Sequence, residues 1–263
     1  MLKYLKLSME INNFMKITLI IPCYNEEANI QKGVLDKIGN FTKNEERFLE
    51  VLIVDDGSSD QSVSIIQNKY LSHFPKFRLI KNPHMGKAYA VIKGINESKG
   101  DFTMFSDIDL ATPIEEAEKL IDFANQNYDI VIGSRSSHRE GAPLTRKVMA
   151  LGMIFIRNYI IGLKGIKDTQ CGFKMFKTSS AKKIVSKLQV FKDKIKTEGS
   201  SVSAGFDLEF LFVASRLKYR MKEVSVSWRH VETKNVTFLK SSIEGLMDII
   251  LIKKYALQKK YDF

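Results

Sequence analysis

The sequence predicts an α/β fold in which helices cover both faces of a mostly parallel central sheet. From Ile17 onward, short apolar blocks alternate with blocks of helical periodicity. The apolar blocks are continuous runs, which is typical of strands that are buried on both faces. A regular alternation of strand and helix favours parallel strands joined by crossover helices.

Each element of the first half is expected from one particular run. The strands are expected at residues 17–23, 50–56, 77–82, 101–107 and 128–134. The intervening helices are expected at residues 26–38, 60–70, 87–98 and 113–125. For the last helix, Thr112 is expected to cap the first turn, Pro113 suits the first position and Glu115 completes a capping box.

The second half is less regular. We expect a strongly apolar helix at 145–163 interrupted by Arg157, a buried helix at 205–217 and a strand at 222–228. Residues 236–257 predict a C-terminal amphipathic helix that ends in lysines, which suits either a membrane interface or packing on the parent domain. We therefore expect an N-terminal extension over 1–16, a domain over 17–235 and a C-terminal segment over 236–263.

Composition limits the partners and the compartment. The chain has 41 Lys and Arg against 30 Asp and Glu, a formal charge of +11, which favours an anionic partner. No apolar run reaches the roughly 18 residues that a membrane span needs, and no signal peptide is evident. Cys23 and Cys171 are far apart and are expected to be buried thiols, so a cytoplasmic location is expected.

Three loops follow predicted strands and carry polar side chains. They are PCYNEE at 22–27, VDDGSSD at 54–60 and SDIDLATP at 106–113. The carboxyl ends of parallel strands form one edge of a sheet, where open α/β sheets bind ligands. Acidic side chains there can accept hydrogen bonds from a base or a ribose, although helix capping by Asn25, Ser59 or Asp60 is an alternative.

Asp107 and Asp109 form a D-x-D pair in the third loop. Two carboxylates, completed by substrate phosphate oxygens, are a typical arrangement for Mg²⁺ or Mn²⁺, whereas an ordinary acidic turn is the simpler interpretation. The chain has no G-x-x-x-x-G-K-[ST] loop and no G-x-G-x-x-G motif, which argues against P-loop nucleotidases and dinucleotide dehydrogenases.

Six motifs together resemble one family. In chain order they are IIPCYNEE, VDDGSSD, NPHMGKAYAVIKG, SDIDLATP, IGSR and KDTQCGFKMF. This order is similar to that of inverting family 2 glycosyltransferases of the GT-A (Rossmann-like) fold, and especially to the polyprenyl-phosphate sugar synthases of the dolichyl-phosphate glucosyltransferase branch, with the mannosyl branch next. The resemblance implies a GT-A catalytic domain with a nucleotide-sugar-binding half at 17–135 and an acceptor half at 136–235.

The resemblance also implies roles at the donor. Asp107 and Asp109 would hold the divalent cation against the donor diphosphate, and Lys87 would face phosphate unless it only caps a helix or is solvated. Lys234 would close over the donor. The remaining donor-binding residues implied by the motifs are Pro22, Tyr24, Glu26, Asp55, Asp56 and Ile108.

At the acceptor, Arg135 and Arg146 resemble the arginines that these enzymes aim at a lipid phosphate, because a guanidinium fork can bind two phosphate oxygens. Surface solvation is the alternative. Asp168 is the best candidate for a base or an orienting group, and Asp207 and Glu209 are weaker candidates. Four residues are expected to be structural or on the surface: His73, His84, His138 and His230.

The implied activity is transfer of a hexose, in particular glucose from UDP-glucose, to a polyprenyl or dolichyl phosphate. The protein would contact an anionic membrane peripherally at its cytosolic face, and no nucleic acid partner is expected. Ala111 and Ala150 depart from the mannosyl pattern. The alternatives are transfer to a glycan or a protein hydroxyl, mannosyl transfer from GDP-mannose, and a non-enzymatic basic module that binds nucleotide or nucleic acid.

Overall fold

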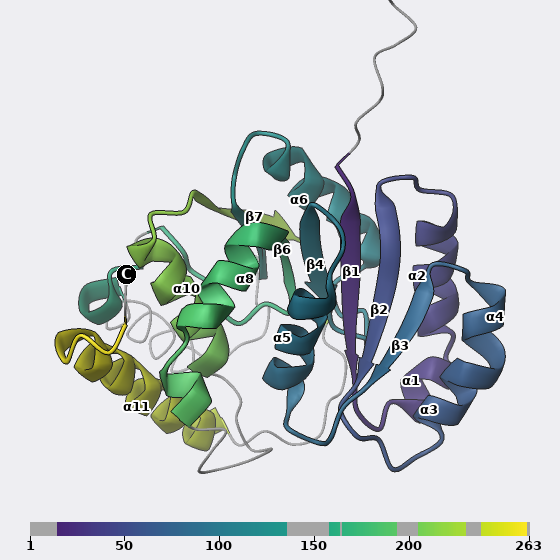
Figure 1. Ribbon diagram of the computed structural model, residues 1–263, viewed down its shortest axis with the longest axis horizontal. Helices are drawn as coiled ribbons and strands as arrows, with labels where there is room; N and C mark the ends of the chain where they lie inside the picture. Colours follow the sequence, from purple (N-terminus) through teal and green to yellow (C-terminus); the bar gives the residue numbers. More distant parts are fainter. Residues whose placement is uncertain (1–14, 136–157, 164, 194–204, 230–237, 262–263) are drawn as a thin grey trace, which may run out of the picture.

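A seven-stranded sheet forms the centre of the computed structural model, which describes residues 15–135, 158–163, 165–193, 205–229 and 238–261 (Figure 1). The strand order is β3-β2-β1-β4-β6-β5-β7. Only β6 is antiparallel to its neighbours, β4 and β5, so the predicted mostly parallel α/β fold is confirmed. The strands are β1 (Ile17–Cys23), β2 (Phe48–Asp55), β3 (Phe77–Lys81), β4 (Phe102–Ser106), β5 (Ile130–Arg135), β6 (Phe173–Lys177) and β7 (Met221–Val226).

Helices cover both faces of this sheet. On one face lie α5 (Lys87–Glu97), α8 (Thr178–Lys187), α10 (Gly205–Arg216) and α11 (Phe238–Leu257). The other face packs on α1 (Glu27–Gln31), α2 (Val34–Lys43), the π-helical turn η1 (Ile66–Tyr70) and α6 (Ala117–Ala124). Leu19 and Ile20 are adjacent in β1, fully buried and in opposite cores. Two such cores explain why the strands are continuous apolar runs.

Several helix boundaries differ from the sequence-based expectation. The helix expected over 26–38 is divided into α1 and α2 at Gly33, whose φ of +80° lies in the left-handed region. The helix expected over 60–70 begins at Ser62 as α3 (Ser62–Ile65) and continues through η1 into α4 (Leu71–His73).

The predicted cap at Thr112 is wrong. The first turn is a 3₁₀ helix, η2 (Ile114–Glu116), and its N-cap is Pro113, whose ψ of 141° keeps it outside the helix. No side chain makes a capping hydrogen bond there. Thr112 therefore lies one residue too early to cap this turn.

In the second half, α10 and β7 confirm the expected helix and strand, whereas β6 was not expected. Residues 145–157 of the expected apolar helix lie outside the described residues, and residues 158–161 are helical. A helix, α11, occupies the expected C-terminal position, and its amphipathic character stays a prediction. None of the described helices combines the length and apolarity needed to cross a membrane.

Both cysteines are buried and free, as expected. Burial raises the pKa of the Cys23 thiol to about 12 and that of Cys171 to about 11. Thiols held this far from ionisation are poor nucleophiles and poor metal ligands, so both cysteines serve packing.

Candidate active site at the carboxyl edge of the sheet

The structure brings the three polar loops together at one edge. β1 pairs in parallel with β2 on one side and with β4 on the other, and Cys23 at the end of β1 is in register with Asp55 at the end of β2. The chain thus reverses its winding direction beside β1, which is where open α/β sheets form their ligand crevice.

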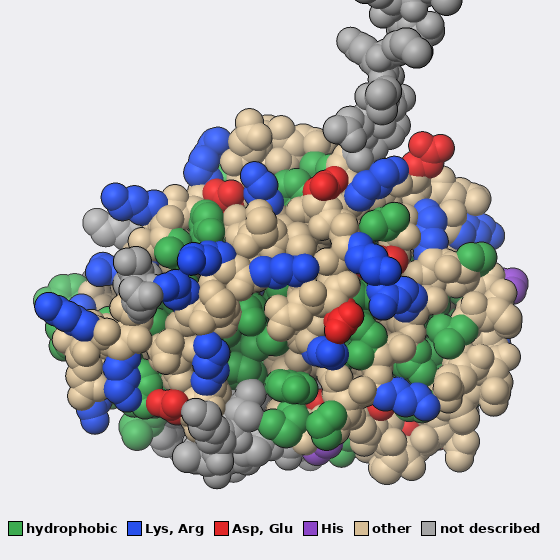
Figure 2. Space-filling view, viewed as in Figure 1, with side chains coloured by type: hydrophobic (Ala, Val, Ile, Leu, Met, Phe, Trp, Pro, Cys, Tyr) green, Lys and Arg blue, Asp and Glu red, His purple; other side chains and the backbone are tan. Residues whose placement is uncertain are grey.

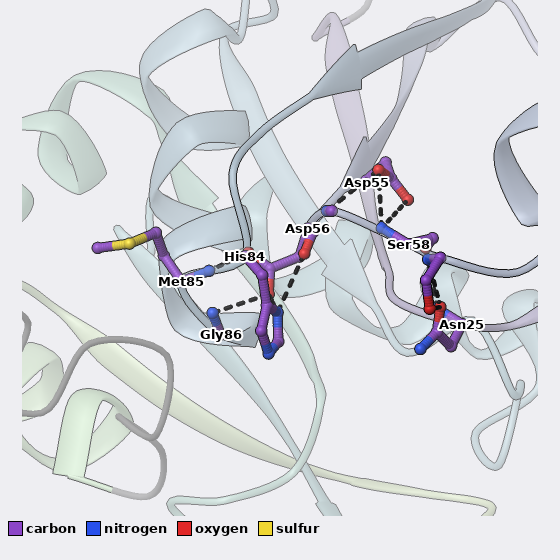
Figure 3. Close-up of polar contacts among 9 residues, drawn as sticks. Asn25, Asp55, Asp56, Ser58, His84, Met85 and Gly86 are labelled. Carbon is purple, nitrogen blue, oxygen red and sulfur yellow. Dashed lines mark hydrogen bonds and ion pairs between the residues drawn. The ribbon is translucent and has the colours of Figure 1, made fainter.

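Asn25 ties the first loop to the second. Its side-chain Oδ1 accepts hydrogen bonds from the backbone N–H of Ser59 (2.8 Å) and of Asp60 (3.3 Å), and its own N–H donates to Ser58 Oγ (2.9 Å) (Figure 3). Asn25 has a φ of +53°, which asparagine tolerates better than most residues. These hydrogen bonds hold the first and second loops together.

Asp55, a predicted nucleoside ligand, is buried in this unit. Its carboxylate accepts hydrogen bonds from the backbone N–H of Gly57 (3.1 Å) and of Ser58 (3.2 Å). Gly57 has a φ of +80°, and a Cβ there would lie 2.9 Å from the backbone nitrogen of His84. Glycine is therefore required for the close approach of the loop that follows β3.

Asp56 organises that loop, as Figure 3 shows. Its buried carboxylate accepts hydrogen bonds from the backbone N–H of Met85 (2.9 Å) and of Gly86 (2.7 Å), and lies 2.8 Å from Nδ1 of His84. The His84 ring stacks on Tyr24, with ring centroids 4.0 Å apart and planes at 10°. His84 was expected to be structural or on the surface, and its place beside Tyr24 could not be read from spacing.

Glu26 lies near the D-x-D pair. It accepts a hydrogen bond from Asn29 Nδ2 (2.6 Å). Burial raises the pKa of the Glu26 carboxyl above its ordinary value, the Asn29 bond partly offsets this, and the charges of Asp109 and Asp107 raise the pKa further. The charges of the third loop thus act on Glu26 in the first loop.

Asp107 forms an ion pair with Lys87, at the first position of α5. Desolvation lowers the pKa of Lys87, but the charge of Asp107 and its hydrogen bond raise the pKa by more, so the ammonium stays charged. A Cβ at Gly172 would overlap the Asp107 carboxylate, and Asp107 N–H donates to the Gly172 carbonyl (3.1 Å). The lack of a side chain at Gly172, just before β6, therefore leaves space for the Asp107 carboxylate.

The donor set around Asp107 and Asp109 suits a divalent cation that a substrate helps to bind. Asp109 Oδ1 accepts a hydrogen bond from Ala111 N–H (3.0 Å), which leaves its other oxygen available. Ile108 between them is buried in the core, so only its backbone can face a ligand. The described residues contain no group of three or more acidic, histidine or cysteine side chains that could hold a metal ion.

Arg135, at the end of β5, is paired with Asp168 through two side-chain hydrogen bonds, Nε to Oδ2 (2.7 Å) and Nη2 to Oδ1 (2.8 Å). The backbone N–H of Arg135 and of Gln170 also donate to this carboxylate. Burial raises the pKa of Asp168, but the hydrogen bonds and charge of Arg135 lower it by more, so its pKa lies below the ordinary value. A carboxylate so engaged is suited to orienting Arg135.

Asp207, on α10, is paired with Lys174 of β6, an interaction that the sequence did not suggest. Lys174 is fully buried, and its Nζ donates to Asp207 Oδ1 (2.6 Å) and to the Cys171 carbonyl (2.7 Å). The only available signal was a lysine within the apolar run FKMF. Glu209 is fully buried and accepts hydrogen bonds from three successive backbone N–H groups, at residues 189–191, which indicates a structural role.

A small cleft of about 50 Å³ connects the third loop with the arginine. Its lining includes Asp107, Ala111, Arg135 and Trp228. The Arg135 guanidinium lies 5.8 Å from the centre of the Trp228 ring. Pro22 is buried in β1. Two predicted site residues, Arg146 and Lys234, lie outside the described residues.

The sheet is doubly wound, and its carboxyl edge carries three acidic loops, Lys87 at the start of α5 and Arg135 held by Asp168. This arrangement is typical of α/β proteins that bind a ligand at this edge. Residues 18–185 match the model of the family described as "Glycosyl transferase family 2". The chain belongs to glycosyl transferase family 2 and is therefore a glycosyltransferase.

The chain also resembles one particular group of glycosyltransferases. It is 28% identical to "Dolichyl-phosphate beta-glucosyltransferase" of Saccharomyces cerevisiae, over 90% of this chain and 74% of that protein. The protein of the same name from Homo sapiens is 30% identical, over 90% of this chain and 75% of the relative. The family predicted from the motifs is thus confirmed.

Solved structures confirm the GT-A fold. Glucosyl-3-phosphoglycerate synthase from Mycobacterium tuberculosis in complex with UDP superposes on this chain with a TM-score of 0.65 and 17% sequence identity. The superposition covers 91% of this chain and 80% of the synthase chain. The same enzyme with Mn²⁺, UDP and glucosyl-3-phosphoglycerate gives a TM-score of 0.63 at 18% identity and the same coverage. At this identity the likeness concerns the fold alone.

Proposed function

We propose that this protein transfers glucose from UDP-glucose to the phosphate of a dolichol or another polyprenol. The observation that carries the proposal is the match, over about nine tenths of the chain, to relatives named dolichyl-phosphate beta-glucosyltransferase. The site supports it, because Asp107, one of the two proposed cation ligands, and Arg135, the proposed phosphate ligand, line the same cleft.

In this proposal Tyr24 and Asp55, with Pro22, Glu26 and Asp56 around them, frame the nucleoside. Lys87 lies at the start of α5, where a helix N-terminus and an ammonium both favour phosphate. Asp107 and Asp109 hold Mg²⁺ or Mn²⁺; a structure of similar fold contains Mn²⁺ with UDP. When bound, the cation neutralises the negative charge that the departing nucleoside diphosphate gains.

On the acceptor side, Arg135 binds the lipid phosphate and Asp168 holds its guanidinium in place. A phosphate oxygen attacks the anomeric carbon while the bond to the UDP oxygen breaks on the opposite face, which inverts the configuration. The acceptor phosphate is ionised at neutral pH, so no strong general base is needed. Arg146 and Lys234 remain proposed ligands of the lipid phosphate and of the donor, respectively.

The reaction is tested by incubating the purified protein and a divalent cation with dolichyl phosphate and each of four labelled donors: UDP-glucose, UDP-galactose, UDP-GlcNAc and GDP-mannose. We expect label in the lipid fraction with UDP-glucose and at least tenfold less with the others. Label that reaches a glycan or protein hydroxyl but not the lipid would refute the proposed acceptor. Preferential transfer from GDP-mannose would refute the proposed sugar.

We further propose peripheral contact with the anionic cytosolic face of a membrane, through a surface that we call the α11 groove. Tyr159, Ile250 and Leu257 line this groove together with Lys253 and Lys254. Ile250 is 51% and Leu257 73% exposed. In Figure 2, basic side chains lie among hydrophobic ones at the end of the molecule where α11 lies. Exposed apolar residues beside lysines suit an interface with anionic lipid.

The double substitution Ile250→Glu and Leu257→Glu should reduce binding to vesicles that contain phosphatidylserine at least tenfold, because two apolar anchors are lost and two negative charges are added. Co-sedimentation measures this. The matched control is Leu49→Glu, an exposed leucine on β2. Vesicle binding of the double variant equal to that of wild type would contradict the proposed contact.

A further inference from the structure

A buried lysine next to the third loop has no part in the proposed function. Lys174 of β6 is 1% exposed, and it is in register with Phe105 of β4, two residues before Asp107. Its Nζ lies 5.1 Å from the centre of the Phe105 ring. A buried ammonium is costly unless it is paired and hydrogen-bonded, so its partners indicate what it is for.

Two groups hold this ammonium. Nζ of Lys174 donates to Oδ1 of Asp207 (2.6 Å) and to the carbonyl oxygen of Cys171 (2.7 Å). Cys171 precedes Gly172, where a Cβ would overlap the Asp107 carboxylate. Lys174 therefore joins the first turn of α10, which carries Asp207, to the segment that packs against a proposed cation ligand.

Asp207 keeps one carboxylate oxygen for another partner. Oδ2 makes no hydrogen bond within the described residues, and the side chain is 26% exposed. Burial lowers the pKa of Lys87, the charge and hydrogen bond of Asp107 raise it, and the charge of Asp207 raises it further. A carboxylate with one oxygen held and the other free can accept a hydrogen bond from a ligand.

We propose that Asp207 binds a hydroxyl group of the donor hexose and that Lys174 is the positioning residue that holds Asp207 in place. Oδ2 of Asp207 accepts the hydrogen bond from the hydroxyl while Oδ1 stays on the Lys174 ammonium. This inference rests on the proposed function, because it takes the ligand to be a hexose attached to a nucleoside diphosphate.

The negative charge of Asp207 selects the part of the donor that it can bind. A carboxylate repels the diphosphate, whereas the hydroxyl groups of a sugar can donate hydrogen bonds to it. Folding alone gives little reason for the Lys174–Asp207 pair. Apolar residues of similar volume in place of a buried ion pair are often neutral for stability or stabilising, so a ligand that needs an oriented carboxylate explains the pair better.

The experiment compares binding of UDP-glucose with binding of UDP, each titrated calorimetrically with Mn²⁺ present. Lys174→Met should weaken UDP-glucose binding about three- to tenfold, because the carboxylate remains but is no longer held in place. The double variant Lys174→Met and Asp207→Leu should weaken it roughly tenfold or more, because a hydrogen bond to a charged group is lost. The affinity for UDP, which has no hexose, should not change in either variant.

Denaturant titration separates this role from a role in folding. Lys174→Met leaves Asp207 without its partner and should unfold at a lower denaturant concentration, whereas the double variant leaves no unpaired charge and should unfold close to wild type. A pair that serves folding alone would instead let UDP-glucose affinity recover together with stability. The control is Arg78→Met, which breaks the 2.6 Å ion pair of Arg78 with Glu50 and should change neither affinity.

Recovery of UDP-glucose affinity in the double variant would overturn the inference alone. Equal losses of UDP and UDP-glucose binding would also overturn it, because they would show a general effect on the site. Lower turnover at unchanged UDP-glucose affinity would do the same, because Asp207 would then act in the reaction and not on the hexose. Failure of the wild-type protein to bind either nucleotide would overturn the proposed donor and this inference together.

Discussion

Substitution of Asp109 by asparagine is expected to reduce glucosyl transfer about 10²- to 10³-fold without loss of the fold. Asparagine keeps the Oδ1 atom that accepts the hydrogen bond from Ala111 N–H, so the third loop should keep its conformation. What is lost is one of the two negative charges that would attract the proposed cation. Because the proposed cation would offset charge that develops as the nucleoside diphosphate leaves, a weaker site is expected to raise the barrier by several kcal/mol.

Two measurements check this expectation. The first is turnover at saturating donor over a range of Mn²⁺ concentrations, and the second is UDP affinity with and without Mn²⁺. The matched control is Asp122→Asn, an exposed aspartate on α6, which should behave as wild type. If turnover and Mn²⁺-dependent nucleotide binding survive in Asp109→Asn, the cation is not held by this aspartate and the D-x-D interpretation fails.

The strands were predictable because their burial is a local property of the sequence. Runs such as ITLIIPC are apolar at nearly every position, since both faces of the sheet are covered, as Leu19 and Ile20 in opposite cores show. β6 was missed because a lysine interrupts FKMF, and only the structure shows Lys174 buried against Asp207. The break at Gly33 depends on its positive φ, which a helical pattern does not reveal.

The site was predictable as a set of loops, but its pairings were not. Asp55 and Arg135 are the last residues of β2 and β5, and Asp107 follows β4, so topology alone places them at one edge of the sheet. Which basic side chain pairs with which carboxylate depends on residues far apart in the sequence. Lys87 pairs with Asp107, and Arg135 pairs with Asp168, 33 residues away. Spacing within one sequence carries no information on such pairs.

Asp168→Asn is expected to lower kcat/KM for the lipid phosphate about 10²-fold and the free energy of unfolding by about 2–3 kcal/mol. The Arg135–Asp168 pair is mostly buried, and loss of the carboxylate leaves the guanidinium without its partner charge. The amide of asparagine would also turn N–H groups toward Arg135. Arg135→Lys should give a similar loss of kcat/KM, because an ammonium cannot form the two parallel bonds.

The dependence on pH distinguishes an orienting carboxylate from a base. The folded-state pKa of Asp168 is lowered, so its contribution to stability is present above the unfolded value of about 4 and is lost as pH falls through the lower folded pKa. The stability difference between wild type and Asp168→Asn should therefore be constant from pH 8 to pH 5, by denaturant titration. Over the same interval the pH profile of kcat/KM should have the same shape in both proteins. Its value should be lower in Asp168→Asn at every pH. An acidic limb in that interval, present in wild type and absent in the variant, would instead identify Asp168 as the general base and contradict the orienting role.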